Sequence, residues 1–169
     1  MILWLLRHAK AVPDPPKGGS DHERVLTPRG RRDADALGRR LAGDRLGLAP
    51  GDLPELVLCS TATRTVQTAE RALAQLDGPP SVDHLRSLYG ATPDQVLDAL
   101  RAVDDRVHSV MVVGHNPTAC DLSVAMDRSP DGRASFPTCA VAVFDLPCRR
   151  WAEVGEGEGR LRGLFAPPY

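Results

Sequence analysis

The sequence predicts a three-layer α/β/α sandwich with a mostly parallel central sheet and an antiparallel edge. Apolar segments of strand length alternate with segments of helical periodicity, as in parallel sheets covered by helices on both faces. Near the end, Ala140 to Leu146 and Arg149 to Val154 are joined around Pro147-Cys148, which indicates a closing antiparallel hairpin. We expect residues 1–169 to form one domain, since this length suits a single core.

The first predicted strand and a long loop open the chain. Met1 to Leu6 is an apolar run of strand length that ends at Arg7-His8. The segment from Ala11 to Val25 is dense in Pro, Gly and charged residues, which is typical of surface loops. We expect this loop to be exposed and mobile.

The first helix is predicted from Thr27 to about Leu46. Thr27 supplies an N-cap, and proline follows it in the first turn. Apolar residues then recur at helical spacing, at Ala34, Leu37 and Leu41.

A second strand and a second helix follow. Leu56 to Cys59 is the predicted strand, and the helix after it stops at the turn Asp77-Gly78-Pro79-Pro80. One face of this helix is apolar, at Val66, Ala69, Leu73 and Leu76. Arg64 therefore falls in its first turn.

Two further helices flank the next strand. Thr92-Pro93-Asp94-Gln95 has the capping-box pattern and predicts a helix with an apolar face of Val96, Leu100 and Val103. Val107 to Val113 is the next strand. Asn116-Pro117 is expected to cap a helix that runs to about Met126, so His115 precedes a helix N-terminus.

Composition and charge exclude several classes of function. The 21 basic and 22 acidic residues leave a net charge of -1, with no excess to attract nucleic acid or an anionic membrane. No apolar stretch approaches the ~20 residues of a membrane span, and the apolar start lacks a basic signal-peptide region. The cysteines show no CxxC spacing and are expected to be reduced structural thiols: Cys59, Cys120, Cys139 and Cys148. These features favour a cytoplasmic protein.

Three predicted strands lead into histidine or arginine. Arg7 and His8 follow the first strand, Arg64 follows the second, and His115 follows Val113. Right-handed crossovers bring the carboxyl ends of parallel strands to one edge, so we expect these four residues to lie together. Guanidinium groups bind phosphate oxygens bidentately, and helix N-termini add free amides. The sequence therefore predicts a pocket for a phosphoryl group or a phosphate- or sulfate-like anion.

A histidine nucleophile is the chemistry that these residues favour. Neutral imidazole attacks phosphorus, while neighbouring cations stabilise the transition state and lower the imidazole pKa. We expect no metal ion and no cofactor, because the strand ends offer mainly cations and no GxxxxGK[ST] phosphate cradle is present. A cysteine phosphatase is an alternative, but Arg64 is one residue too close to Cys59 for the Cys-x5-Arg motif.

At these residues the chain resembles the histidine phosphatase superfamily, whose opening signature Leu-x-Arg-His-Gly stands here as Leu5-Leu6-Arg7-His8-Ala9. The resemblance continues in order through residues 26–30, 60–69 and 113–117. It implies a phosphoglycerate mutase-like fold in which His8 becomes phosphorylated. It also implies that Arg7, Arg64 and His115 form the phosphate pocket.

The short chain and the stretch Asp21-x-x-Arg24-x-Leu26-Thr27-x-x-Gly30 look most like the small SixA-type phosphohistidine phosphatases. This resemblance implies that Arg24 lines the pocket mouth. Ala9, which replaces the family's usual glycine, and Asn116 are further candidate substrate-binding residues.

One departure from the family bears on the substrate. Members that act on alkyl phosphates carry a glutamate shortly before a Tyr-Gly or similar turn, whereas His84 to Gly90 contains no carboxylate. Asp83 and Asp94 flank this stretch. Each is expected to be a residue of a strand end or of a first helical turn and not the missing acid. The absence of an acid, and a chain too short for a large lid, favour phosphohistidine on a partner protein. A small-molecule phosphomonoesterase or mutase and a non-catalytic phosphate-binding module are the alternatives.

Overall fold

The structure is a computed structural model that describes residues 1–127 and 135–169. Six strands form one sheet in the order β3-β2-β4-β1-β5-β6. The strands are β1 (Ile2–Arg7), β2 (Leu56–Ser60), β3 (Ser81–Leu85), β4 (Ser109–Gly114), β5 (Val141–Asp145) and β6 (Arg160–Phe165). The α-helices of the described residues are α1 (Pro28–Ala42), α2 (Thr63–Leu73), α3 (Pro93–Arg101) and α4 (Thr118–Met126).

The sheet is parallel except at one edge. β1 pairs in parallel with β4, β4 with β2, and β2 with β3. β5 runs antiparallel between β1 and β6. The predicted parallel sheet with an antiparallel edge is therefore confirmed.

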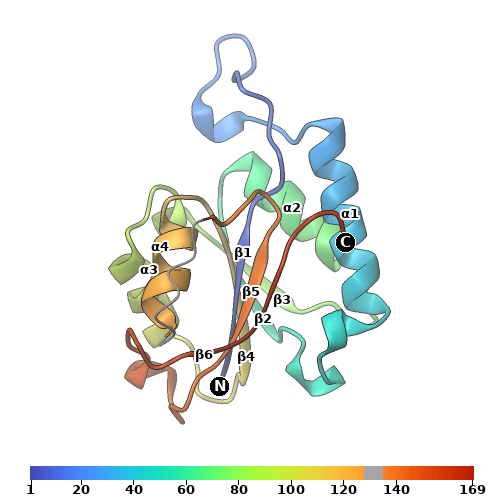
Figure 1. Ribbon diagram of the computed structural model, residues 1–169. Coiled ribbons are helices and arrows are strands. Elements are labelled where there is room, and N and C mark those ends of the chain that lie inside the picture. Colours follow the sequence, from blue (N-terminus) through green and yellow to red (C-terminus); the bar gives the residue numbers. More distant parts are fainter. Residues whose placement is uncertain (128–134) are drawn as a thin grey trace.

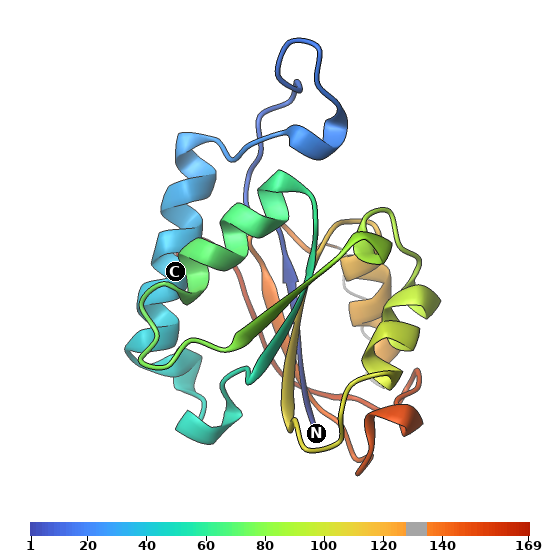
Figure 2. The ribbon, with the colours of Figure 1, turned by 180° about the vertical axis from the view of Figure 1, so that it is seen from behind.

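Helices cover both faces of the sheet (Figures 1 and 2). Successive side chains of a strand point to opposite faces, and β1 supplies two separate cores. Trp4 and Leu6 pack in one core with apolar residues of α1 and α2. Leu3 and Leu5 pack in the other with residues of α3 and α4. This arrangement confirms the three-layer α/β/α prediction.

The prediction that Arg149 to Val154 forms the second strand of the hairpin is wrong. The segment from Arg149 to Val154 holds a 3-10 turn at Trp151–Glu153, and the strand that pairs with β5 is β6. Trp151 and Val154 are both buried, and a spacing of three is that of a helical turn, not of a strand. The indole nitrogen of Trp151 also donates to the Val107 carbonyl at 2.7 Å, which holds the turn against the core.

The ends of two helices and one edge strand also differ from the prediction. α1 ends at Ala42, because the backbone of Gly43 leaves helical geometry. Leu46 lies in a separate 3-10 turn but is also buried, so it continues the apolar pattern of the helix in the sequence. α2 ends at Leu73, before Leu76. β3 has no counterpart among the predicted strands, because its side chains are exposed or half-buried and show no alternation of buried residues.

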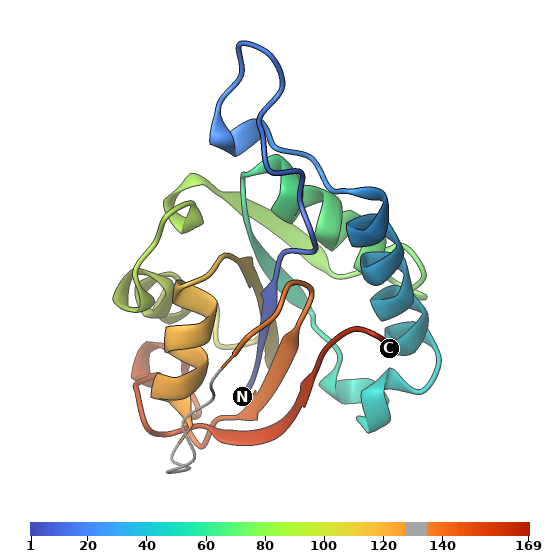
Figure 3. The ribbon, with the colours of Figure 1, turned by 45° about the horizontal axis from the view of Figure 1, so that its top comes forward.

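The loop from Ala11 to Val25 extends beyond the carboxyl edge of the sheet (Figure 3). Most of its residues are exposed. A β-bridge between Ala11 and Leu26 closes its base, and Ala11 itself is buried. Near its end a short 3-10 turn, Asp21–Glu23, is capped by Ser20, whose amide donates to the Glu23 carboxylate at 2.7 Å. Within the described ranges, no helix has the length and hydropathy needed to cross a bilayer.

Candidate active site

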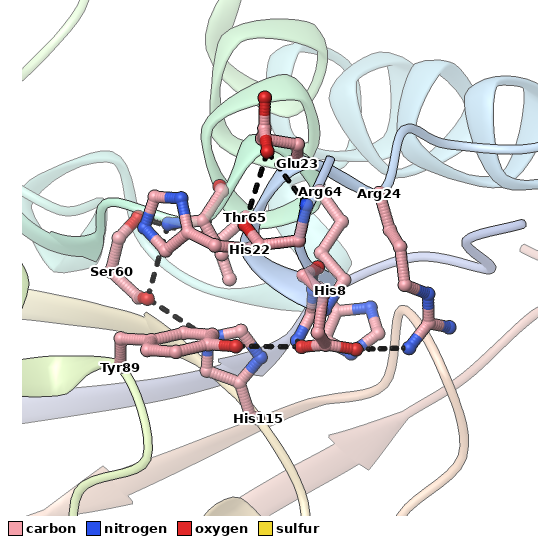
Figure 4. A network of polar contacts seen from close by, with 12 residues as sticks. His8, His22, Glu23, Arg24, Ser60, Arg64, Thr65, Tyr89 and His115 are labelled. Carbon is pink, nitrogen blue, oxygen red and sulfur yellow. Dashed lines mark hydrogen bonds and ion pairs between the residues drawn. The ribbon is translucent and has the colours of Figure 1, made fainter. Parts of the chain in front are cut away.

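The carboxyl ends of β1, β2 and β4 lie side by side and bring the two strand-end histidines together. The register pairs Arg7 of β1 with Gly114 of β4, so His8 and His115 follow at the same level of the sheet. Their ring centroids are 5.3 Å apart. Arg64 reaches the same edge from the first turn of α2, as predicted (Figure 4).

His8 presents one nitrogen to the pocket. Its Nδ1 lies 2.7 Å from the Ala9 carbonyl, which only accepts, so Nδ1 carries the hydrogen and Nε2 keeps a lone pair. Burial lowers the pKa of His8 to about 4; the bond to Ala9 opposes the shift, and the cations of Arg64, Arg7 and Arg24 add to it. The expected effect of the cations is present, but burial is the larger cause.

His115 is also held neutral. Its Nε2 lies 2.9 Å from the hydroxyl of Ser60, at the end of β2. Burial, followed by the neighbouring His8 and Arg64, lowers the pKa of His115 to about 3, against the opposing charge of Asp21. The Nδ1 atom is buried and has no hydrogen-bond partner among the described residues.

The arginines are held by different partners. Arg7 donates from Nη1 to the Phe136 carbonyl at 2.8 Å, and its buried Nε has no partner within the described part of the chain. Arg24 donates from Nε to the Val12 carbonyl at 2.7 Å. Only 8% of the Arg64 side chain is exposed, so its cation is fixed at the pocket wall.

Asp21, which the sequence placed in the SixA-like stretch without a role, lies among these cations. Its carboxylate accepts hydrogen bonds from Arg24 Nη1 at 2.7 Å and from Arg64 Nη2 at 3.0 Å. The Tyr89 hydroxyl donates to the same carboxylate at 2.7 Å. Hydrogen bonds from Arg24 and Tyr89, together with the Arg64 charge, lower the pKa of Asp21, so the carboxylate is ionised at neutral pH.

Tyr89 is a second site residue without a sequence-based assignment. Its ring meets His115 edge-on at 5.7 Å and His22 edge-on at 4.8 Å. The guanidinium carbons of Arg86 and Arg64 lie 5.1 and 5.9 Å from the ring centroid. His22 in turn contacts the Thr61 hydroxyl at 2.9 Å, so an aromatic wall closes one side of the pocket.

Two candidate substrate-binding residues have structural partners. Ala9 is fully buried, and its amide donates to the Thr68 hydroxyl at 3.0 Å, so that amide is not free for an anion. Asn116 does not cap α4 as expected. Its Nδ2 donates to the Phe136 carbonyl at 3.0 Å instead, and α4 begins at Thr118 after Pro117.

The structure disfavours the cysteine alternative. Cys59 is fully buried in the core, and burial raises the pKa of its thiol to about 12, so the thiolate needed for attack is not formed. Asp83 lies within β3 and Asp94 in the first turn of α3, and both are exposed. Within residues 1–127 and 135–169, no group of three or more His, Cys, Asp or Glu side chains is placed to hold a metal ion.

Comparison with known families adds to this geometry. The model of the histidine phosphatase superfamily (branch 1) matches residues 3–88. The uncharacterized protein Rv1276c of Mycobacterium tuberculosis is 38% identical over 173 residues, covering 96% of this chain and 99% of the relative. An uncharacterized chloroplastic protein of Arabidopsis thaliana is 30% identical, over 98% of this chain and 77% of its own length.

Solved structures share the whole fold. A candidate phosphohistidine phosphatase SixA from Nakamurella multipartitia superposes with a TM-score of 0.82 at 29% identity, covering 99% of this chain and 96% of that one. A candidate SixA from Agrobacterium tumefaciens gives 0.78 at 30% identity, with 98% and 97% covered. The protein histidine phosphatase SixA complexed with tungstate gives 0.78 at 26% identity, with 99% and 97% covered.

Proposed function

The chain belongs to the histidine phosphatase superfamily, and we propose that it hydrolyses phosphoryl groups without a metal ion, through a phosphohistidine intermediate on His8. The state of His8 carries this proposal. Its Nδ1 hydrogen is engaged by Ala9, its Nε2 lone pair is free at neutral pH, and guanidinium groups surround it. Such a nitrogen is a nucleophile suited to phosphorus.

The first chemical step transfers the phosphoryl group to His8. Nε2 donates its lone pair to phosphorus, and the bond between phosphorus and the leaving group breaks. The electron pair of that bond departs with the leaving group, which takes up a proton. Arg7 and Arg64 stabilise the negative charge spread over the phosphoryl oxygens, and His115 closes the other side of the group.

The second step releases inorganic phosphate. Water attacks the phosphorus of phosphorylated His8, the P–N bond breaks, and its electron pair returns to Nε2. The proton lost by water passes to solvent with the product. This step regenerates the neutral imidazole that burial already favours.

We infer that the substrate is phosphohistidine on a partner protein. The segment from His84 to Gly90 carries no carboxylate, and the flanking Asp83 and Asp94 are exposed outside the pocket. Asp21, the carboxylate inside the pocket, is ionised and cannot donate a proton at neutral pH. A leaving imidazole takes a proton readily near neutral pH, which an alkoxide leaving group does not do without a positioned acid.

The proposal is tested by trapping the phosphorylated protein. During turnover in excess chelator, acid-labile phosphate should appear on His8, and mass spectrometry of peptides kept at alkaline pH should place it there. His8→Ala should abolish both turnover and labelling. The control is His84→Ala, because His84 is exposed on β3 outside the site and its loss should leave the rate unchanged. Labelling elsewhere, or a strict need for added magnesium, would refute the mechanism.

A further inference from the structure

Asp21 engages side chains that are suited to bind an anion. Both outer nitrogens of Arg64 donate to this one residue, Nη1 to its backbone carbonyl at 2.8 Å and Nη2 to its carboxylate at 3.0 Å. Arg24 and the Tyr89 hydroxyl complete the contacts, each at 2.7 Å from a carboxylate oxygen. Two guanidinium groups and a hydroxyl around two oxygens are the donors that a phosphoryl group would use.

The carboxylate and a phosphoryl group compete for the same donors. Each outer nitrogen of Arg64 directs one of its two hydrogens at residue 21. A second anion at that position would also be repelled by the first. A phosphoryl group that takes these two hydrogens therefore displaces residue 21 from them.

The segment that carries Asp21 is held by polar contacts and buries none of its side chains fully. All three residues of its 3-10 turn are exposed or half-buried, and 51% of the Asp21 side chain is exposed, against 8% for Arg64. The turn belongs to the loop that extends beyond the carboxyl edge of the sheet. Segments with few buried contacts open at low cost, so the loop and not the arginine is the part that moves.

We propose that Asp21 is an internal competitor for the phosphate site, which closes the empty pocket and is displaced when a phosphoryl group binds. The inference rests on the proposed phosphate pocket. Arg24, Arg64 and Tyr89 pass from the carboxylate to the incoming group. The closed state lowers the apparent affinity for phosphate by the fraction of molecules that are open.

The test compares the affinity for inorganic phosphate of the unaltered protein, Asp21→Asn and Asp21→Ala, by isothermal titration calorimetry at low ionic strength. Removing the charge should lower the Kd by about tenfold, the effect expected when the closed state is populated about ten times more than the open one. Glu23→Gln is the matched control. Glu23 lies in the same turn, but its side chain accepts the amide of the N-cap residue Ser20, and glutamine keeps that hydrogen bond. The Kd of Glu23→Gln for phosphate should therefore equal that of the unaltered protein.

The alternative is that Asp21 positions the arginines for catalysis. In that case both Asp21 variants would bind phosphate more weakly than the unaltered protein or equally well, and the competitor would be overturned. A failure of the proposed function is seen separately. If the unaltered protein turns over phosphohistidine but neither variant gains affinity, only the competitor falls. If the variants gain affinity and no protein is phosphorylated on His8, only the catalytic proposal falls; absence of phosphate binding in every protein, together with no labelling of His8, rejects both.

Discussion

The side chain of Arg64 is almost entirely buried, and its guanidinium faces the pocket from the first turn of α2. A charge fixed in this way costs no reorganisation when negative charge develops on the phosphoryl oxygens. Arg64→Ala should therefore lower kcat by about 10² to 10³ and change KM less, because such donors act mainly in the transition state. Steady-state kinetics on phosphohistidine measure both constants.

Two variants serve as controls for Arg64→Ala: one keeps the positive charge at residue 64, and the other removes an arginine elsewhere in α2. Arg64→Lys should recover only part of the rate, because an ammonium lacks the two-nitrogen fork. Arg71→Ala should have little effect, since Arg71 lies further along α2 and pairs with Asp35 at 2.9 Å. An Arg64→Ala variant with unchanged kcat and a raised KM would show that the arginine binds the substrate and the transition state equally.

Some site residues can be identified from the sequence immediately around them, and others cannot. Arg7, His8 and His115 lie at the ends of recognisable strands and Arg64 lies in the first turn of the helix after one, so one topological rule brings them together. Their placement at one edge was predictable for that reason, and their roles stay predictions.

Asp21 and Tyr89 were missed because their roles arise from a contact across 68 positions of the chain. Asp21 lies in a loop with no periodic pattern, and Tyr89 follows a turn that was considered only for its lack of a carboxylate. No local spacing links two such segments. Only the folded loop shows that they share a hydrogen bond beside Arg64.

At the level of the elements, the start of α1 packs closely on the chain that leaves β1. Gly30 has no room for a side chain, because an added Cβ would lie 2.1 Å from the Lys10 carbonyl oxygen. The same carbonyl accepts the Thr27 amide at 2.9 Å, so the contact also fixes the N-cap of the helix. This packing ties the base of the Asp21 loop to α1.

Gly30→Ala should therefore destabilise the protein by about 1 to 3 kcal/mol, although alanine favours helix formation by ~1 kcal/mol relative to glycine. Urea unfolding at pH 7.5 measures the change. Gly51→Ala is the control, since an added Cβ at Gly51 would contact nothing within 4 Å. A Gly30→Ala variant as stable as the parent would mean that the helix start shifts freely away from Lys10.

The elements that the sequence predicted well are continuous apolar strands buried on both faces or helices with a periodic apolar face. β1, β2 and β4 are central strands with buried side chains, and α1 to α3 each have an apolar stripe. The strands at the two edges of the sheet, β3 and β6, leave many side chains exposed, so their hydrophobic signal is weak. In β6 the stabilising contacts are instead polar, as in the Arg162–Asp145 pair at 2.6 Å.

For the whole molecule, two buried neutral imidazoles make stability depend on pH. The unfolded chain binds a proton on each histidine near pH 6.5, whereas in the folded protein the pKa is about 4 for His8 and about 3 for His115. The unfolded state therefore binds more protons between these values, and the free energy of unfolding falls as the pH drops below 6.5. Above pH 7 the two groups contribute nothing.

We expect unfolding in urea to show a loss of up to about 4 kcal/mol between pH 7 and pH 5, about 2 kcal/mol for each histidine. The double variant His8→Asn, His115→Asn should lose most of this slope. Asp21 does not interfere, because its pKa is lowered and its contribution to stability is lost only at more acidic pH. A constant free energy of unfolding from pH 7 to pH 5 in the unaltered protein would show that the two imidazoles have the same pKa in the folded and unfolded states.

The substrate depends on the pocket as a whole, which offers many cations and no neutral acid. A positioned acid contributes about 10²- to 10⁴-fold when an alkoxide must leave, whereas the nitrogen of phosphohistidine is protonated from solvent. The protein should therefore cleave phosphohistidine faster than phosphoserine or glycerate phosphates, and should cleave aryl phosphates measurably because phenolates depart readily.

Parallel initial rates on these substrates decide the assignment, with Asp83→Asn and Asp94→Asn as controls that should not change the phosphohistidine rate because both residues are exposed outside the pocket. A higher rate on phosphoserine or phosphoglycerate would require a proton donor and would move the assignment to a small-molecule phosphatase or mutase. Phosphate binding without turnover of any substrate would leave a non-catalytic binding module. Preference for the phosphoramidate means that solvent protonates the leaving imidazole nitrogen and that no carboxylic acid of the protein is needed as the proton donor.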